Sequence, residues 1–121
     1  MAEKQQVFGV FYRDYAHEVA ISSASPESLL AERLPALAER LLVNEDNYLG
    51  VVDRNEVILQ LFLEDDGRIV VELLRPNIPG YLRLVMPRAQ ALALLAHLPE
   101  AFGPELLPGA EMTNGDESEG C

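Results

Sequence analysis

The sequence predicts an α+β fold: an antiparallel β-sheet of roughly four to six strands, built around a central meander, with two helices packed on one face. Three strand-like stretches follow one another with short turns, at about Tyr48 to Val52, Glu56 to Glu64 and Arg68 to Arg75. Short turns join antiparallel neighbours, whereas parallel strands need long crossovers. Leu- and Ala-rich stretches with helical spacing lie on both sides of this meander.

The N-terminal stretch from Val7 to Ile21 is rich in aromatic and β-branched residues around a polar Arg-Asp centre. This composition predicts either a strand pair or one long bent strand.

A first helix is expected to begin after Ser25, which is a favourable N-cap, with Pro26 in the first turn. Four leucines then follow at helical spacing and form one apolar stripe: Leu30, Leu34, Leu37 and Leu41. Pro35 interrupts this stripe, so the helix is expected to be kinked there or divided into two short helices.

After the meander, a Pro-Asn-Ile-Pro-Gly loop leads to a short strand at Tyr81 to Met86. Pro87 then opens a second helix that Pro99 stops. Residues 1–108 are expected to form a single domain, because 121 residues suffice for one core. Residues 109–121 have four acids and no apolar periodicity, which predicts a disordered acidic tail.

The turn between the second and third strands of the meander decides how these strands pair. A two-residue loop would place Glu72 opposite Leu61, among apolar residues. A three-residue loop with Gly67 left-handed pairs Leu61 with Val71 instead, and a one-residue slip would exchange the two faces. We therefore predict the three-residue loop. The other expected pairs are Glu64 with Arg68, Leu63 with Ile69, Gln60 with Glu72, and Leu59 with Leu73.

This register gives the hairpin one apolar face and one mixed face. The apolar face is expected to pack on the helices and consists of Val57, Leu59, Leu61, Leu63, Ile69, Val71 and Leu73. The mixed face consists of Ile58, Gln60, Phe62, Glu64, Arg68, Val70, Glu72 and Leu74. Such a composition is typical of a surface that something else covers. The alternatives are the protein's own N-terminal segment, a second copy in a homodimer, or a partner protein.

The formal net charge of −11, from twenty acids and nine bases, repels phosphate backbones and anionic lipid. We therefore expect no nucleic-acid or membrane partner. The charge favours a basic protein partner, and the alternative interpretation is that it only keeps the chain soluble.

The cysteine content and the lack of long apolar runs indicate the cellular compartment of the protein. The one cysteine, Cys121, allows no intramolecular disulfide and no metal site of the Cys-pair type. No apolar run approaches the ~20 residues of a membrane span, and the first six residues lack the layout of a secretory signal. The expected location is the cytoplasm.

No motif in the sequence carries catalytic chemistry: it contains no phosphate loop, dinucleotide-binding turn, metalloprotease helix or serine elbow. The densest polar cluster, Tyr12 to Glu18, is interpreted as a hairpin turn, with a small enzyme site that uses His17 as the alternative. His97 is expected to face solvent or the end of the second helix. The carboxylate clusters lack the alternating oxygen ligands of a calcium loop, so we expect no metal and no cofactor.

The stretch from Tyr48 to Leu98 resembles small bacterial immunity-type proteins encoded beside polymorphic toxins. The resemblance is carried by "NYLGVVDRNEVILQLFLEDDGRIVVELL", "GYLRLVM" and "ALALLAHL". It implies a protein that neutralises a toxin by binding it, without turnover. The interrupted first helix and the "PNIPG" loop depart from that pattern.

The order of helix, three-strand meander and helix, with an acidic charge, also resembles type III secretion chaperones. This implies a dimer that holds an unfolded effector segment. The chain departs from these chaperones because it begins with strands and lacks a second strand pair before a long final helix.

The leading hypothesis is a non-enzymatic, acidic, immunity-like module that occludes a basic partner protein with electrostatic steering. Its alternatives are a dimeric chaperone-like protein, a purely structural dimer subunit, and a small enzyme that uses the Tyr12 to Glu18 cluster. The expected contact residues are Ile58, Phe62, Glu64, Val70 and Glu72, followed by Tyr12, Asp14 and Tyr15.

Overall fold

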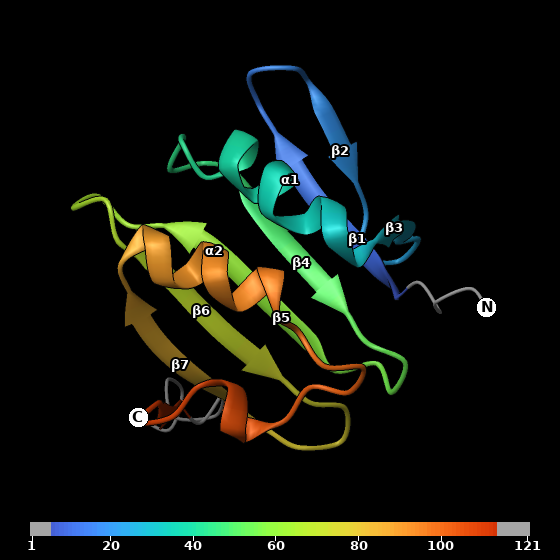
Figure 1. Ribbon diagram of the computed structural model, residues 1–121, viewed down its shortest axis with the longest axis vertical. Coiled ribbons are helices and arrows are strands. Elements are labelled where there is room, and N and C mark those ends of the chain that lie inside the picture. Colours follow the sequence, from blue (N-terminus) through green and yellow to red (C-terminus); the bar gives the residue numbers. More distant parts are fainter. Residues whose placement is uncertain (1–5, 114–121) are drawn as a thin grey trace.

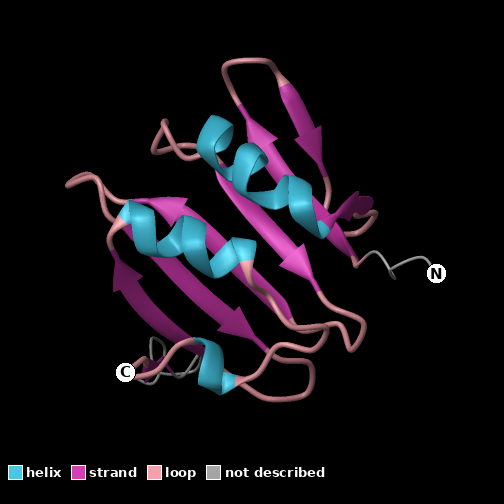
Figure 2. Cartoon of the chain, in the orientation of Figure 1, coloured by secondary structure: helices cyan, strands magenta, loops and turns pink. Residues whose placement is uncertain are grey.

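The computed structural model describes residues 6–113, which form an eight-stranded antiparallel sheet with two α-helices on one face (Figure 1). The helices and the strands make two separate layers (Figure 2). The strands are β1 (Val7–Asp14), β2 (Val19–Ile21), β3 (Glu27–Leu30), β4 (Tyr48–Val52), β5 (Ile58–Leu63), β6 (Ile69–Leu74), β7 (Tyr81–Met86) and β8 (Glu111–Thr113). The helices are α1 (Leu34–Leu41) and α2 (Arg88–Ala96), with short 3-10 turns η1 (Ala31–Arg33) and η2 (Pro104–Leu106). The predicted α+β fold is confirmed.

The strand order is β2-β1-β4-β5-β6-β7-β8, and β3 pairs with the edge of β1 that also pairs with β2. The short strands β2, β3 and β8 raise the number of strands above the predicted range. The N-terminal stretch forms a strand pair, which confirms one of its two predicted forms. Because β1 extends the sheet beside β4, this segment does not cover the mixed face of the hairpin.

The predicted start of the first helix after Ser25 is wrong. Glu27–Leu30 is the strand β3, which pairs with β1, and the α-helix begins only at Leu34 after a 3-10 turn. Pro35 therefore lies in the first turn of α1, where its missing N–H removes no helical hydrogen bond. In a helix that began at residue 26, the same proline would have removed a backbone hydrogen bond in the middle of the helix.

The hairpin of β5 and β6 has the predicted three-residue loop. Gly67 has a φ of 90° and its N–H donates to the Glu64 carbonyl over 3.0 Å, while the Glu64 N–H donates to the Arg68 carbonyl over 2.8 Å. The register pairs Gln60 with Glu72 and Leu61 with Val71, so the prediction is confirmed.

The predicted disordered tail begins too early, because Glu111–Thr113 forms β8 on the free edge of β7. An edge strand is held by backbone hydrogen bonds and needs no apolar periodicity in its side chains. The preceding segment is anchored in the core by Phe102 and Leu107, which are 6% and 2% exposed. The rest of the predicted tail, residues 114–121 with Cys121, lies outside the described residues.

The core lies between the sheet and the helix layer. Leu59, Leu61, Val71 and Leu73 from the apolar hairpin face are fully buried, as are Leu34 and Leu41 of α1. The Arg88 side chain of α2 links the two helices, because it donates hydrogen bonds to the Leu42 and Glu39 carbonyls at the end of α1. Within residues 6–113, no helix combines the length and the apolar content needed to cross a bilayer.

Candidate functional site

The sheet face opposite the helices, called the open face here, carries no helix among the described residues (Figure 1). Its side chains form three rows across the strands. The first row is mostly apolar and consists of Arg13, Tyr48, Phe62, Val70 and Val85. The middle row is mostly polar and consists of Phe11, Gly50, Gln60, Glu72, Arg83 and Glu111. The third row is apolar and consists of Gly9, Val52, Ile58 and Leu74.

Glu72 is the centre of the polar row and is 8% exposed. Its carboxylate accepts hydrogen bonds from Arg83 over 3.1 Å and from Gln60 over 3.4 Å. Arg83 also lies 3.7 Å from the Glu64 carboxylate. Burial raises the pKa of Glu72, and the positive charge of Arg83 offsets this only in part. The open face thus holds a carboxylate that would gain from a further positive charge.

The apolar rows differ in how much of them a partner can reach. Tyr48 is 37% exposed, and Phe62 and Ile58 are partly exposed. Val70 lies beside Phe62 in the first row but is fully buried, so it supports the surface without contributing to it. Of the five predicted contact residues from the hairpin, all lie on the open face, and Phe62, Ile58 and Glu64 are accessible there.

The end of the open face near β1 is hollowed into a cavity of about 400 Å³, called the aromatic pocket here. Its lining consists of Phe11, Ser23, Glu45, Asp46, Asn47, Tyr48, Gln60 and Phe62. Sequence reasoning missed Phe11, Tyr48 and the two acids as site residues. Phe11 lies opposite Gly50, and this pairing depends on how β1 joins β4, which no local pattern in the sequence indicates.

Asp14, at the end of β1, is a structural anchor and is 1% exposed. Its carboxylate accepts from the His17 N–H over 3.3 Å, contacts the His17 Nδ1 at 2.9 Å, and lies 3.4 Å from the Arg40 Nε. Burial acts to raise the pKa of Asp14, but the hydrogen bonds from His17 and the charges of His17 and Arg40 outweigh it and hold the pKa below its ordinary value. Asp14 therefore fixes the β1–β2 turn, and a partner cannot reach it directly.

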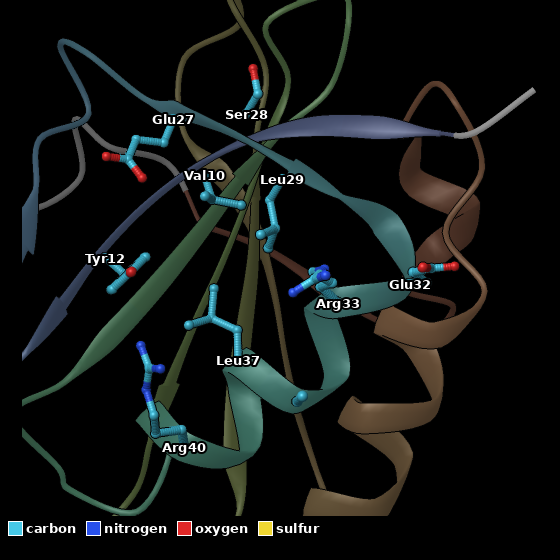
Figure 3. Close-up of a pocket in the computed structure, with 10 residues that line it drawn as sticks. Val10, Tyr12, Glu27, Ser28, Leu29, Glu32, Arg33, Leu37 and Arg40 are labelled. Carbon is cyan, nitrogen blue, oxygen red and sulfur yellow. The ribbon is translucent and has the colours of Figure 1, made fainter.

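Tyr12 and Asp14 lie on the helix side of the sheet, away from Phe62 and Glu72. Tyr12 lines a groove of about 560 Å³ between β1, β3 and α1 (Figure 3). Arg40 extends from α1 toward Tyr12 (Figure 3). The groove is lined by two arginines and two glutamates: Arg33, Arg40, Glu27 and Glu32.

Tyr15 lies in the β1–β2 turn and is 49% exposed. The Arg13 guanidinium lies over its ring at 4.5 Å, and Arg13 belongs to the first row, so Tyr15 adjoins the open face at its margin. The structure thus separates the second group of predicted contact residues: Tyr15 is near the open face, and Tyr12 and Asp14 are not.

The Tyr12 to Glu18 cluster comprises the end of β1 and the turn, residues 15–18, that leads to β2. The His17 side chain is 61% exposed, and neither it nor Asp14 lines the groove or the aromatic pocket. His97 follows α2 and faces solvent, as expected. Within the described part of the chain, no three His, Cys, Asp or Glu side chains come together as a possible metal site.

No protein-family model, curated protein or solved structure matches this chain. The resemblances to immunity-type proteins and to secretion chaperones therefore remain predictions. The function has to be inferred from the geometry of the open face.

Proposed function

We propose that the protein is a non-enzymatic module that binds a basic partner protein through the open face. The observation that carries this proposal is the face itself: two apolar rows flank a paired polar row, and no described element covers them. Binding surfaces combine apolar anchors with polar groups in this way, and large uncovered apolar patches are uncommon on monomers.

The charge of the chain favours a basic partner over a second copy. Each copy carries −11, so pairing two copies brings like charges together, whereas a basic protein is attracted. On the open face, Arg83 already pairs with Glu72 and Glu64, so it adds little positive charge toward a partner. Electrostatic complementarity of this kind speeds association and excludes wrong partners.

The mechanism we propose is occlusion without turnover. A partner that seats an apolar patch against Tyr48, Phe62 and Ile58 would have the covered part of its own surface blocked. The polar row fixes the orientation, because an incoming group has to match the buried Glu72 and the partly exposed Arg83. This is the mode of action that the resemblance to immunity-type proteins implies. A second copy on the same face, as in a chaperone-like dimer, is the alternative.

The experiment is a capture assay with paired variants and a salt series. Phe62→Asp and Tyr48→Asp place a charge on the open face, and Val43→Asp makes the same change in the turn after α1, outside the three rows and the lining of the aromatic pocket, where Val43 is 67% exposed. We expect a basic protein that the wild type and Val43→Asp both retain, that both open-face variants lose, and that roughly 0.5 M salt releases through screening. Loss of a hot-spot side chain at the centre of an interface costs about 2 kcal/mol or more.

Circular dichroism and thermal melting of each variant verify that it is folded before capture. Retention of the partner by both folded open-face variants, or equal loss with Val43→Asp, would contradict the proposal.

A further inference from the structure

Three aromatic side chains line the aromatic pocket: Phe11, Tyr48 and Phe62. Phe11 is 5% exposed and its ring lies against Gly50, where a Cβ atom would stand only 2.0 Å from the ring. Tyr48 and Phe62 are cross-strand neighbours, and the Phe11 and Tyr48 ring centroids are 6.4 Å apart at an interplanar angle of 58°. The faces of such rings carry partial negative charge and attract cations.

The rim of the pocket carries two carboxylates, Glu45 and Asp46, on a turn that hydrogen bonds hold in place. The Asp46 N–H donates to the Asn44 side chain over 2.8 Å. The side chain of Asn47, 1% exposed, donates to the Leu41 carbonyl over 2.9 Å and accepts from the Tyr15 N–H over 2.9 Å. The carboxylates are therefore presented from a fixed backbone.

The lining of the aromatic pocket contains no Lys, Arg or His from the described residues, whereas the groove on the helix side contains two arginines. Its cavity volume of about 400 Å³ lies in the lower part of the about 300–1,000 Å³ that ligand pockets span. The aromatic pocket thus combines a negative lining with room for a side-chain head group.

We propose that the aromatic pocket receives the guanidinium group of an arginine on the partner protein. A planar guanidinium stacks on aromatic rings and also matches carboxylates with paired N–H donors, which a lysine ammonium does not. Arg13 already adopts this stacking over Tyr15 at 4.5 Å on the margin of the same face. The inference rests on the proposed function, since it names the group that the partner presents.

The test is an NMR titration of the isotope-labelled chain with Nα-acetyl-arginine amide. The citrulline derivative is the matched control, because it has nearly the same shape and no charge. We expect the arginine probe to shift the amide signals of residues 45–48 and 60–62, and the citrulline probe to bind several-fold more weakly. Equal binding of the two probes, or shifts confined to another surface, would overturn the proposal.

Two variants identify the groups that bind the probe. The double variant Glu45→Gln and Asp46→Asn changes only exposed side chains and is expected to weaken binding about three- to tenfold. Phe62→Leu keeps an apolar side chain, although a smaller one, and removes an aromatic face, with an expected loss of about two- to fivefold. The control double variant Glu32→Gln and Glu39→Gln makes the same change in net charge on the helix side and should leave binding unchanged. Unchanged binding in both pocket variants would overturn the proposal.

The titration uses the chain alone, so it separates this inference from the proposed function. If arginine binds in the pocket but Phe62→Asp does not affect partner capture, the result supports the arginine site and contradicts the proposed function. If Phe62→Asp abolishes capture but arginine does not bind, the result supports the proposed function and contradicts the arginine site. Equal affinity for the Nα-acetyl-lysine amide would overturn the assignment of a guanidinium.

Discussion

Gly50 determines where the Phe11 ring can lie on the open face. A Cβ atom at this position would approach the ring to 2.0 Å, so Gly50→Ala forces the ring out of its place. Overpacking of this kind costs about 1–3 kcal/mol, and we expect a decrease of that size in the free energy of unfolding, measured by urea denaturation.

Gly9→Ala is the matched control in the neighbouring strand. The atoms nearest to its added Cβ would be those of Pro26 at 3.4 Å and Val52 at 3.5 Å, so the change is expected to stay within about 0.5 kcal/mol of the wild type. Equal effects of the two substitutions would contradict the packing described for Phe11.

Glu72 should make the stability of the fold depend on pH. Its pKa is raised in the folded state, so the folded protein holds this proton more tightly than the unfolded chain does. The contribution of Glu72 to stability is therefore complete below the ordinary glutamate pKa and is lost as the pH rises through the raised value. Glu72→Gln removes this dependence. Comparing urea denaturation of both proteins between pH 7 and pH 4, we expect the wild type to gain stability relative to the variant as the pH falls, and a constant difference would contradict the assignment.

At the scale of single residues, the sequence predicts the cross-strand pairs within the β5–β6 hairpin. It does not predict the side-chain contacts between different elements. The pairing of Gln60 with Glu72 follows from the turn chemistry of Gly67 and the period of two in a strand. The burial of Asp14 depends on α1, which lies far away in the sequence, and the Arg83 partner of Glu72 depends on the register that β7 takes beside β6 across a loop. Local patterns do not contain that information.

The first helix is the element in which propensity and tertiary pairing disagree. Residues 27–30 have a helix-compatible sequence, yet they pair with β1, which offers a free edge. Propensity is a weak prior that tertiary context overrides. The position of Pro35 is then the feature that sets the start of α1.

Pro35→Ala distinguishes a proline at the start of a helix from one inside it. In the first turn, proline limits the unfolded chain without loss of a hydrogen bond, so its removal should destabilise the fold by about 0.4–1 kcal/mol. Inside a helix, removal of a proline should instead stabilise by about 3 kcal/mol. Thermal and urea unfolding of the variant give the sign directly, and a clear gain in stability would contradict the start of α1 at Leu34.

Tertiary pairing also outweighs the local sequence pattern at β8. Its three residues, Glu111 to Thr113, contain a single apolar side chain and are too few to show an alternating pattern, so the sequence predicts no strand there. The strand forms because β7 has a free edge beside it. The hairpin of β5 and β6, in contrast, could be predicted because the strands and their turn are contiguous in the chain.

At the scale of the molecule, the sheet separates two surfaces that the sequence alone could not separate. The period of two predicted the mixed composition of the open face around Ile58 and Phe62. It could not place Tyr12 on the opposite side, because this depends on how β1 joins the sheet. The aromatic pocket was not predicted for the same reason, since three strands and two loops contribute to it.

We propose that the open face binds a basic partner protein and not a second copy of the chain. The net charge of −11 on each copy opposes self-association, and the apolar rows remain for a basic protein. The most direct measurement is the solution mass by light scattering, at low salt and at roughly 0.5 M salt, where charge repulsion is screened. We expect the mass of one chain, 13.4 kDa, under both conditions. A dimer that persists in salt and is lost in folded Phe62→Asp would show that a second copy covers the open face, and would contradict the claim.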